Sequence, residues 1–231
     1  MKIHIFYRHY NTSDNGSNYR PKGFNYEKCF INLLDTIKNT NVELHVVFDG
    51  NIKSNFINKY KDEFTLHEIK AGNDYKSAIQ TYNLAYSIVK KNNDLIYFLE
   101  NDYLHVKGWV EKVTELFSKY KLLHYISLYD HNDKYFLPMY ENLVSKVFVT
   151  QNHHWRSTPS TCGSFIITRE LLELDFNTHI STIGDHNKFI QLNKEKNRIV
   201  ITPIPGLSTH CMEGLMSPVV NWEQINNKID I

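Results

Sequence analysis

Apolar residues in the first hundred positions recur in patterns typical of alternating strands and helices. In residues 3–9, Ile3, Ile5 and Tyr7 alternate with His4, Phe6 and Arg8. Residues 94–102 hold an unbroken apolar run that is followed by Glu100, Asn101 and Asp102. Period-two alternation predicts a strand, and a short run rich in β-formers predicts a strand buried on both faces. The elements predicted between them are helix 25–38, strand 42–48, helix 53–64, strand 65–70 and helix 77–91.

This order of elements predicts the class of fold. Strand and helix alternate four times before residue 102, which indicates a mostly parallel sheet with helices on its faces. The remaining pattern predicts helix 109–120, strands 123–129, 145–150 and 164–168, helices 169–174 and 185–193, and strand 198–202. No linker or internal repeat marks a boundary, so we expect a single α/β domain over residues 1–231.

Composition excludes several classes of function. The 26 Lys and Arg residues nearly balance the 25 Asp and Glu residues, so charge gives no support to nucleic-acid binding. The three cysteines, Cys29, Cys162 and Cys211, form no CxxC pair, which favours a reducing compartment and a cytoplasmic protein. No stretch approaches the roughly 18 apolar residues of a membrane span, and we expect no transmembrane segment.

The acids that follow the buried strand are the first candidate site. Side chains at i and i+2 point the same way, so Glu100 and Asp102 can face one site with Asn101 turned aside. Ligands of open α/β sheets bind at the carboxyl ends of strands, and paired carboxylates suit Mg²⁺ or Mn²⁺ held together with substrate phosphates. The alternative is an ordinary solvated strand end, where acids are common.

Two other strand ends of the first half carry candidate ligands. Arg8, Arg20 and Lys22 flank a long polar loop after the first strand and can meet a diphosphate, although three ordinary surface cations are an equal alternative. Asp49, followed by Gly50, ends the second strand. It can hydrogen-bond a ribose or base edge, but Asp-Gly is also a common turn.

The second half carries polar residues that suit a bound substrate. Residues 152–163 gather aromatic, basic and hydroxyl side chains in one predicted loop, including Trp155, Arg156 and Ser160. Trp155 or Trp222 can stack on a sugar ring, and the alternative for each is a tryptophan of the core.

Two residues near the end of the chain suit acid-base or metal chemistry. Asp185 stands at the start of a predicted helix, where an acid commonly caps the helix and where a negative charge, as a general base needs, is favoured. His210 lies in a second stretch of candidate metal ligands, residues 208–212.

The order of elements together with the acids at 100–102 resembles the glycosyltransferases of the GT-A fold, in particular the family 2-like enzymes. The segment 154–161, with its His-Trp-Arg and Ser-Thr residues, is also similar to loops of small viral and bacterial sugar transferases. The resemblance implies a GT-A (Rossmann-like) fold with a mostly parallel central sheet flanked by helices. Residues 1–102 would form the nucleotide-binding half and residues 103–231 the acceptor-binding half.

The resemblance also implies roles for single residues. Asp49 matches the acid that contacts the nucleoside, and Asp102 matches the acid that ligates the metal. Asp185 matches the catalytic base of inverting members, and His210 matches a late histidine that completes the metal shell in some enzymes. Glu100 departs from the usual aspartate, and its longer side chain puts direct metal contact in doubt.

The function implied is a Mn²⁺- or Mg²⁺-dependent glycosyltransferase of hexosyl or deoxyhexosyl type. It would move a sugar from a nucleoside-diphosphate donor, with UDP-sugar favoured, to a hydroxyl of a saccharide acceptor, with inversion. The site residues expected are Arg8, Asp49, Glu100, Asn101 and Asp102 for the donor and nucleotide, Asp102 and His210 for the metal, Asp185 for catalysis, and Trp155, Arg156 and Ser160 for the acceptor.

Three other functions fit parts of the pattern. A nucleotidyltransferase that makes nucleotide sugars shares the alternating fold, but it normally carries a glycine-rich phosphate loop after strand one, where this chain has only Gly16 and Gly23. A carbohydrate-binding domain without turnover would use the same pocket. The 12 histidines also leave open a metal hydrolase with tightly bound zinc.

Overall fold

A computed structural model describes residues 1–11, 19–120 and 124–231. Most of the predicted polar loop after the first strand, residues 12–18, and the predicted start of strand 123–129 lie outside these ranges. The centre is a nine-stranded sheet with the spatial order β3 (Thr65–Ile69), β2 (Val42–Asp49), β1 (Ile3–Tyr10), β4 (Leu95–Leu99), β9 (Phe165–Thr168), β6 (Tyr125–Ile126), β10 (Val200–Ile204), β8 (His154–Thr158) and β7 (Val147–Val149).

The sheet is mostly parallel, as the alternating pattern predicts. Strands β3, β2, β1 and β4 pair in parallel, and only β9 and β8 among the nine described strands run against the common direction. The carboxyl ends of β1, β2 and β4 therefore meet at one edge, directly before the polar residues singled out in the sequence.

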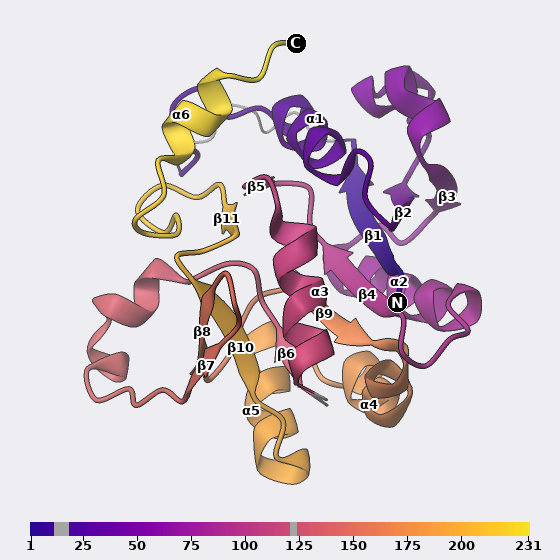
Figure 1. Ribbon diagram of the computed structural model, residues 1–231. Coiled ribbons are helices and arrows are strands. Elements are labelled where there is room, and N and C mark those ends of the chain that lie inside the picture. Colours follow the sequence, from indigo (N-terminus) through magenta and orange to yellow (C-terminus); the bar gives the residue numbers. More distant parts are fainter. Residues whose placement is uncertain (12–18, 121–123) are drawn as a thin grey trace.

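Helices cover both faces of this sheet (Figure 1). Helices α1 (Tyr26–Ile37) and α3 (Trp109–Lys119) pack on one face, whereas α2 (Asp74–Ile88), α4 (Arg169–Ser181) and α5 (Asp185–Lys196) pack on the other. None of the described helices has both the length and the apolarity that a membrane crossing requires.

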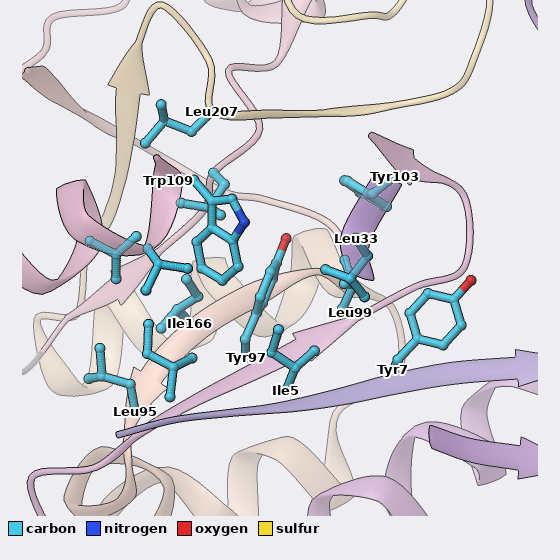
Figure 2. Close-up of a cluster of buried hydrophobic side chains, with 14 of the residues drawn as sticks. Ile5, Tyr7, Leu33, Leu95, Tyr97, Leu99, Tyr103, Trp109, Ile166 and Leu207 are labelled. Atoms are coloured by element: carbon cyan, nitrogen blue, oxygen red, sulfur yellow. The ribbon is translucent and has the colours of Figure 1, made fainter. Parts of the chain in front are cut away.

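The two faces of β4 show how the central strand holds the layers together. Leu95, Tyr97 and Leu99 point toward α1 and α3, whereas Ile96 and Phe98 point toward α2 and α4. All five are almost completely buried, which is why the sequence shows an unbroken apolar run here instead of an alternating one. Figure 2 shows the first three of these side chains among residues of β1, β9, α1 and α3.

A second, two-stranded sheet lies at the carboxyl edge of β4. It pairs β5 (Tyr103–His105) with β11 (Ser208–His210) in antiparallel register, so that His210 lies opposite Tyr103. The sequence does not predict this pairing, because two three-residue strands far apart in the chain leave no periodic signal. The pairing brings the late histidine next to the acids that follow β4.

Some predicted elements differ in the structure. The predicted helix 53–64 is two 3-10 helices, η1 (Ile52–Ser54) and η2 (Phe56–Glu63), because the side chains of Asn51 and Asn55 each cap a new turn. The predicted helix 169–174 extends through α4, whose buried Asp175 interrupts the apolar pattern but is paired with Lys196 and Arg198.

The remaining short elements lie in the second half of the chain. They are η3 (Asn132–Tyr135), η4 (Pro138–Tyr140) and α6 (Trp222–Asn227). Trp222 is buried beside Phe24, Leu104 and Cys211, which corresponds to the core alternative for this tryptophan. The predicted loop 152–163 contains strand β8, which the mixed polar residues of that segment concealed.

Candidate functional site

A cavity of about 810 Å³ opens at the carboxyl ends of β1, β2 and β4. Its walls come from the segments after these strands, from the start of α2 and from the end of β11. Six residues singled out from the sequence for the donor and the metal line it: Arg8, Asp49, Glu100, Asn101, Asp102 and His210. The parallel register of β1, β2 and β4 places the first five together near one edge of the sheet, and the pairing of β11 with β5 adds His210.

Glu100 is held by a guanidinium and by a hydroxyl. Arg8 Nη2 lies 3.0 Å from Glu100 Oε1, while Arg8 Nη1 lies 2.7 Å from a carboxylate oxygen of Asp74 at the start of α2. Ser164 Oγ accepts a hydrogen bond of 3.0 Å from the Glu100 backbone N–H. Burial raises the pKa of Glu100 to about 7, with Arg8 opposing this shift and the Asp102 carboxylate reinforcing it.

Asp102 is the most strongly engaged acid of the cavity. Its Oδ2 atom lies 2.8 Å from Arg20 Nη1 and accepts a hydrogen bond of 2.9 Å from His210 Nε2. Burial alone would raise the pKa of Asp102, but the hydrogen bond from His210 and the charge of Arg20 outweigh burial and lower it. For His210 the signs are reversed. Burial alone would lower the pKa of His210, but the hydrogen bond to Asp102 outweighs burial and raises it. The other oxygen, Asp102 Oδ1, is buried without a hydrogen-bond partner.

Asn101 and Asp49 both line the cavity while holding neighbouring segments. The Asn101 amide nitrogen donates a hydrogen bond of 2.7 Å to His9 Nδ1, and its backbone carbonyl accepts one from the Tyr7 hydroxyl. The two carboxylate oxygens of Asp49 accept hydrogen bonds from the backbone N–H groups of Ala71 and Gly72, at 2.8 and 2.9 Å. Asp49 thereby fixes the loop that leads into α2. Each of its oxygens retains a second acceptor position.

Several cavity residues were not predicted as ligands. Tyr10 and Tyr19 line the cavity and are 49% and 42% exposed, so both present aromatic surface at its mouth. Arg20, one of the three cations expected to meet a diphosphate, also lines the cavity and is fixed by Tyr26 and by the backbone carbonyl of Cys211. Tyr10 could have been predicted from the sequence, because it is a large aromatic residue at the end of the first strand, at the edge of the sheet where ligands bind.

Asp185 lies outside this cavity lining, at the first position of α5. The residue before it, Gly184, occupies the capping position with φ of +82°, so Asp185 does not cap the helix as the simplest interpretation of the sequence suggested. Its carboxylate forms an ion pair of 3.3 Å with the buried Lys188, which also donates a hydrogen bond to the Tyr82 hydroxyl. Asp185 is close enough to Glu100 to raise the pKa of that acid.

The three residues expected at an acceptor do not line the cavity. Trp155 is completely buried and its ring offers no exposed face, which corresponds to the core alternative. Arg156 is also buried, pairs with Asp130 at 2.8 Å and borders a second cavity of about 660 Å³. Ser160 Oγ lies 3.3 Å from the Nδ1 atom of His186 and is thereby placed beside the start of α5.

Comparisons with known proteins identify the fold. No protein-family model and no curated protein matches the chain. Among solved structures, S. aureus TarS 1-349 superposes with a TM-score of 0.56 at 12% identity, over 87% of this chain and 58% of that chain. The same protein in complex with UDP gives a TM-score of 0.50 at 13% identity, over 87% of this chain and 57% of that chain.

A second solved structure has a similar size. CMP:2-keto-3-deoxy-manno-octonic acid synthetase complexed with CTP superposes with a TM-score of 0.52 at 12% identity, over 89% of this chain and 92% of that chain. At these identities the similarity shows the fold, which is GT-A-like as the resemblance in the sequence implied. The chain thus spans somewhat more than half of TarS 1-349 and almost all of the synthetase.

Proposed function

We propose that this protein is a metal-dependent glycosyltransferase that moves a sugar from a nucleoside diphosphate to a hydroxyl of a saccharide acceptor. One observation carries the proposal. The two acids after β4, two arginines from the first strand and its following loop, and the histidine of β11 all line one cavity at the carboxyl edge of the sheet. A cavity of about 810 Å³ has the size of a small-molecule site, which typically measures about 300–1,000 Å³.

The charges of the cavity favour a donor that arrives with a cation. Arg8 and Arg20 are fixed guanidinium groups, whose forked geometry suits phosphate oxygens. Both are paired with acids, and the carboxylates that line the cavity are Asp49, Asp74, Glu100 and Asp102. Asp49, Asp74 and Asp102 already outnumber the two guanidinium groups, and Glu100 adds negative charge when it is ionised, so a bound diphosphate would meet excess negative charge. A bound cation would offset that charge.

The residues present fit a Mn²⁺ or Mg²⁺ ion. Asp102 Oδ1 is a buried acceptor without a partner, and His210 lies on the other side of the same carboxylate. Asp102 and His210 would hold the ion, with the remaining ligands coming from phosphates and water, as is usual for these cations. When bound, the ion would stabilise negative charge on the departing diphosphate. Glu100, already held by Arg8 and Ser164, would position the donor.

The acceptor would bind on the α5 side of the cavity. In the reaction the bond between the anomeric carbon and the phosphate oxygen breaks, and the acceptor oxygen bonds to that carbon while losing its proton. We assign the proton to the Asp185 carboxylate, which would act as general base and produce inversion. The position of Ser160 beside the start of α5 supports an acceptor subsite there, and Arg156 would contribute from the neighbouring cavity.

The similar structures support the substrate class. The TarS structure in complex with UDP favours a UDP-sugar as donor. The synthetase complexed with CTP instead favours a nucleotidyltransferase, and its chain is nearly the length of this one. That enzyme class is the second candidate. A cytoplasmic location is part of the proposal as well. It rests on the three cysteines, which are free thiols and form no disulfide with one another.

Product analysis separates the candidates. The protein would be incubated with a panel of nucleoside-diphosphate sugars and Mn²⁺, and in parallel with nucleoside triphosphates and free sugars. A glycosyltransferase releases nucleoside diphosphate in the first set, whereas a nucleotidyltransferase releases pyrophosphate in the second. A carbohydrate-binding domain releases neither product. Pyrophosphate release alone would replace the proposal with the second candidate.

A further inference from the structure

A second cluster of ligand-type side chains lies near the opposite ends of the same strands. His4 is the second residue of β1, and it stands in register with Glu43 on β2. His45 follows Glu43 by two residues, so the alternation of a strand places all three side chains on one face of the sheet. None of these residues lines the cavity described above. The proposed transferase reaction uses none of them.

The distances within the cluster match a metal site. His4 Nδ1 and His45 Nε2 lie 3.5 Å apart, and they lie 3.8 and 3.6 Å from the two carboxylate oxygens of Glu43. Zn²⁺ binds such atoms at about 2.0–2.2 Å in a tetrahedron, whose ligand atoms are then about 3.3–3.5 Å apart. One ligand atom from each residue lies within 4.8 Å of the other two, so a rotation of the partly exposed Glu43 carboxylate would bring the three atoms to the spacing of a tetrahedral site. Of the residues that the structure describes, these are the three that bring His, Cys, Asp or Glu atoms within 4.8 Å of one another.

The other ring nitrogens of both histidines face polar partners, at hydrogen-bond distance for His45 and slightly beyond it for His4. His4 Nε2 lies 3.7 Å from a carboxylate oxygen of Asp94, and His45 Nδ1 lies 3.2 Å from His67 Nε2. Metal-binding histidines typically use the second nitrogen in this way, which fixes the ring and directs the first nitrogen at the metal. Stacking of His45 on Phe6, with ring centroids 4.6 Å apart, further restrains that ring.

Charge in the cluster is compatible with a cation. The facing charged groups are Glu43, Asp94 and Lys2, whose ammonium lies 3.0 Å from Glu43. The Lys2 side chain is 43% exposed, so it can turn into solvent when Glu43 accepts a metal.

We propose that His4, Glu43 and His45 bind a zinc ion, with water as the fourth ligand, at a site separate from the nucleotide cavity. The ion would join β1 to β2, the two strands that also carry Arg8 and Asp49 at their other ends. Without an ion, the same residues would form a chain of neutral histidine hydrogen bonds from His4 through His45 to His67. The test must distinguish this hydrogen-bonded arrangement from a zinc site.

The test uses tag-free protein of residues 1–231 that has been stripped with a chelator. Zn²⁺ is titrated in competition with a chromogenic chelator, and Co²⁺ is added separately to record the visible absorption of a tetrahedral site. We expect one high-affinity equivalent. Glu43→Gln and His45→Gln should each weaken the affinity for Zn²⁺ at least tenfold. His67→Gln should weaken this affinity about tenfold, because the substitution removes the partner that holds the His45 ring.

A matched variant keeps the result independent of the proposed transferase. Asp102→Asn removes the acid of the nucleotide cavity and should leave the affinity for Zn²⁺ unchanged. Thermal unfolding of each variant without metal shows that the fold persists, and partly exposed Glu43 makes that variant the least disruptive. The proposal is overturned if no equivalent of Zn²⁺ binds, if Glu43→Gln binds it as tightly as the natural chain, or if Asp102→Asn abolishes binding.

Discussion

Arg20 Nη1 lies 2.8 Å from Asp102 Oδ2, and the two side chains are only 7% and 10% exposed. This ion pair joins the segment after β1 to the acid after β4 within the lining of the cavity. The guanidinium also lies over the rings of Phe24 and Tyr26, at 4.5 and 5.5 Å from their centroids. Arg20 is thus held in place beside the acid that we assign to the metal.

Replacement of Arg20 should weaken donor binding. Arg20→Gln leaves Asp102 without its guanidinium partner and removes a fixed contact for the diphosphate, which we expect to reduce UDP affinity by about tenfold or more. Arg20→Lys keeps the positive charge but loses the forked geometry of the guanidinium. Its affinity for UDP should therefore lie between those of the natural chain and Arg20→Gln. Isothermal titration of the three proteins measures this order. Equal affinities would exclude Arg20 from the donor site.

Asp185→Asn should separate binding from transfer. The change keeps the size of the side chain and removes the proton acceptor, so we expect unchanged UDP affinity and a transfer rate lower by about 10²–10⁴-fold. Lys188→Met serves as a comparison, because it removes the ion pair of Asp185 while leaving the carboxylate. Near-normal transfer by Asp185→Asn would contradict the inverting assignment without affecting the fold.

Gly163→Ala should disturb Glu100. A Cβ atom at this position would lie 2.7 Å from Glu100 Oε1, an oxygen that also pairs with Arg8. The methyl group must therefore displace the carboxylate, and we expect weaker donor binding with little change in melting temperature. A double-mutant cycle with Glu100→Ala tests the cause. If Gly163→Ala reduces donor affinity as much in the Glu100→Ala variant as in the natural chain, a clash with Glu100 is not the cause of the weaker binding.

Buried neutral histidines should make the fold less stable in acid. Burial lowers the pKa of His105 to about 3, so below pH 6.5 the unfolded chain binds a proton that the folded chain does not. The free energy of unfolding then falls as the pH decreases, by about 2 kcal/mol at pH 5 for this group. Urea unfolding at pH 7.5 and pH 5.0 measures the loss, and His105→Gln should reduce it. An equal loss in the variant would remove His105 from the explanation.

The sequence predicted the parts of the site that follow long, buried strands. The run that ends at Leu99 fixed the position of Glu100 and Asp102, and the parallel order of strands placed Arg8 and Asp49 at the same edge. A sheet that is buried on both faces leaves a strong apolar signal, and polar residues at its strand ends then stand out.

The contacts that complete the site could not be predicted. The pairing of β5 with β11, which places His210 2.9 Å from Asp102, joins residues more than a hundred positions apart. No periodic pattern encodes such a pairing. Trp155 was expected to face a ligand because its neighbours are polar, yet β8 turns its ring into the core. Short strands with mixed residues hide which face is buried.

The most direct test of the central claim is the effect of Mn²⁺ on UDP binding to the natural chain and to Asp102→Asn. Asp74→Asn is the matched control, since Asp74 lines the same cavity and pairs with Arg8 but is not assigned to the metal. We predict that Mn²⁺ strengthens UDP binding to the natural chain and to Asp74→Asn and has no effect on Asp102→Asn. If UDP affinity is independent of Mn²⁺ in all three proteins, or if Asp102→Asn responds like the natural chain, the cavity does not bind a metal-diphosphate group.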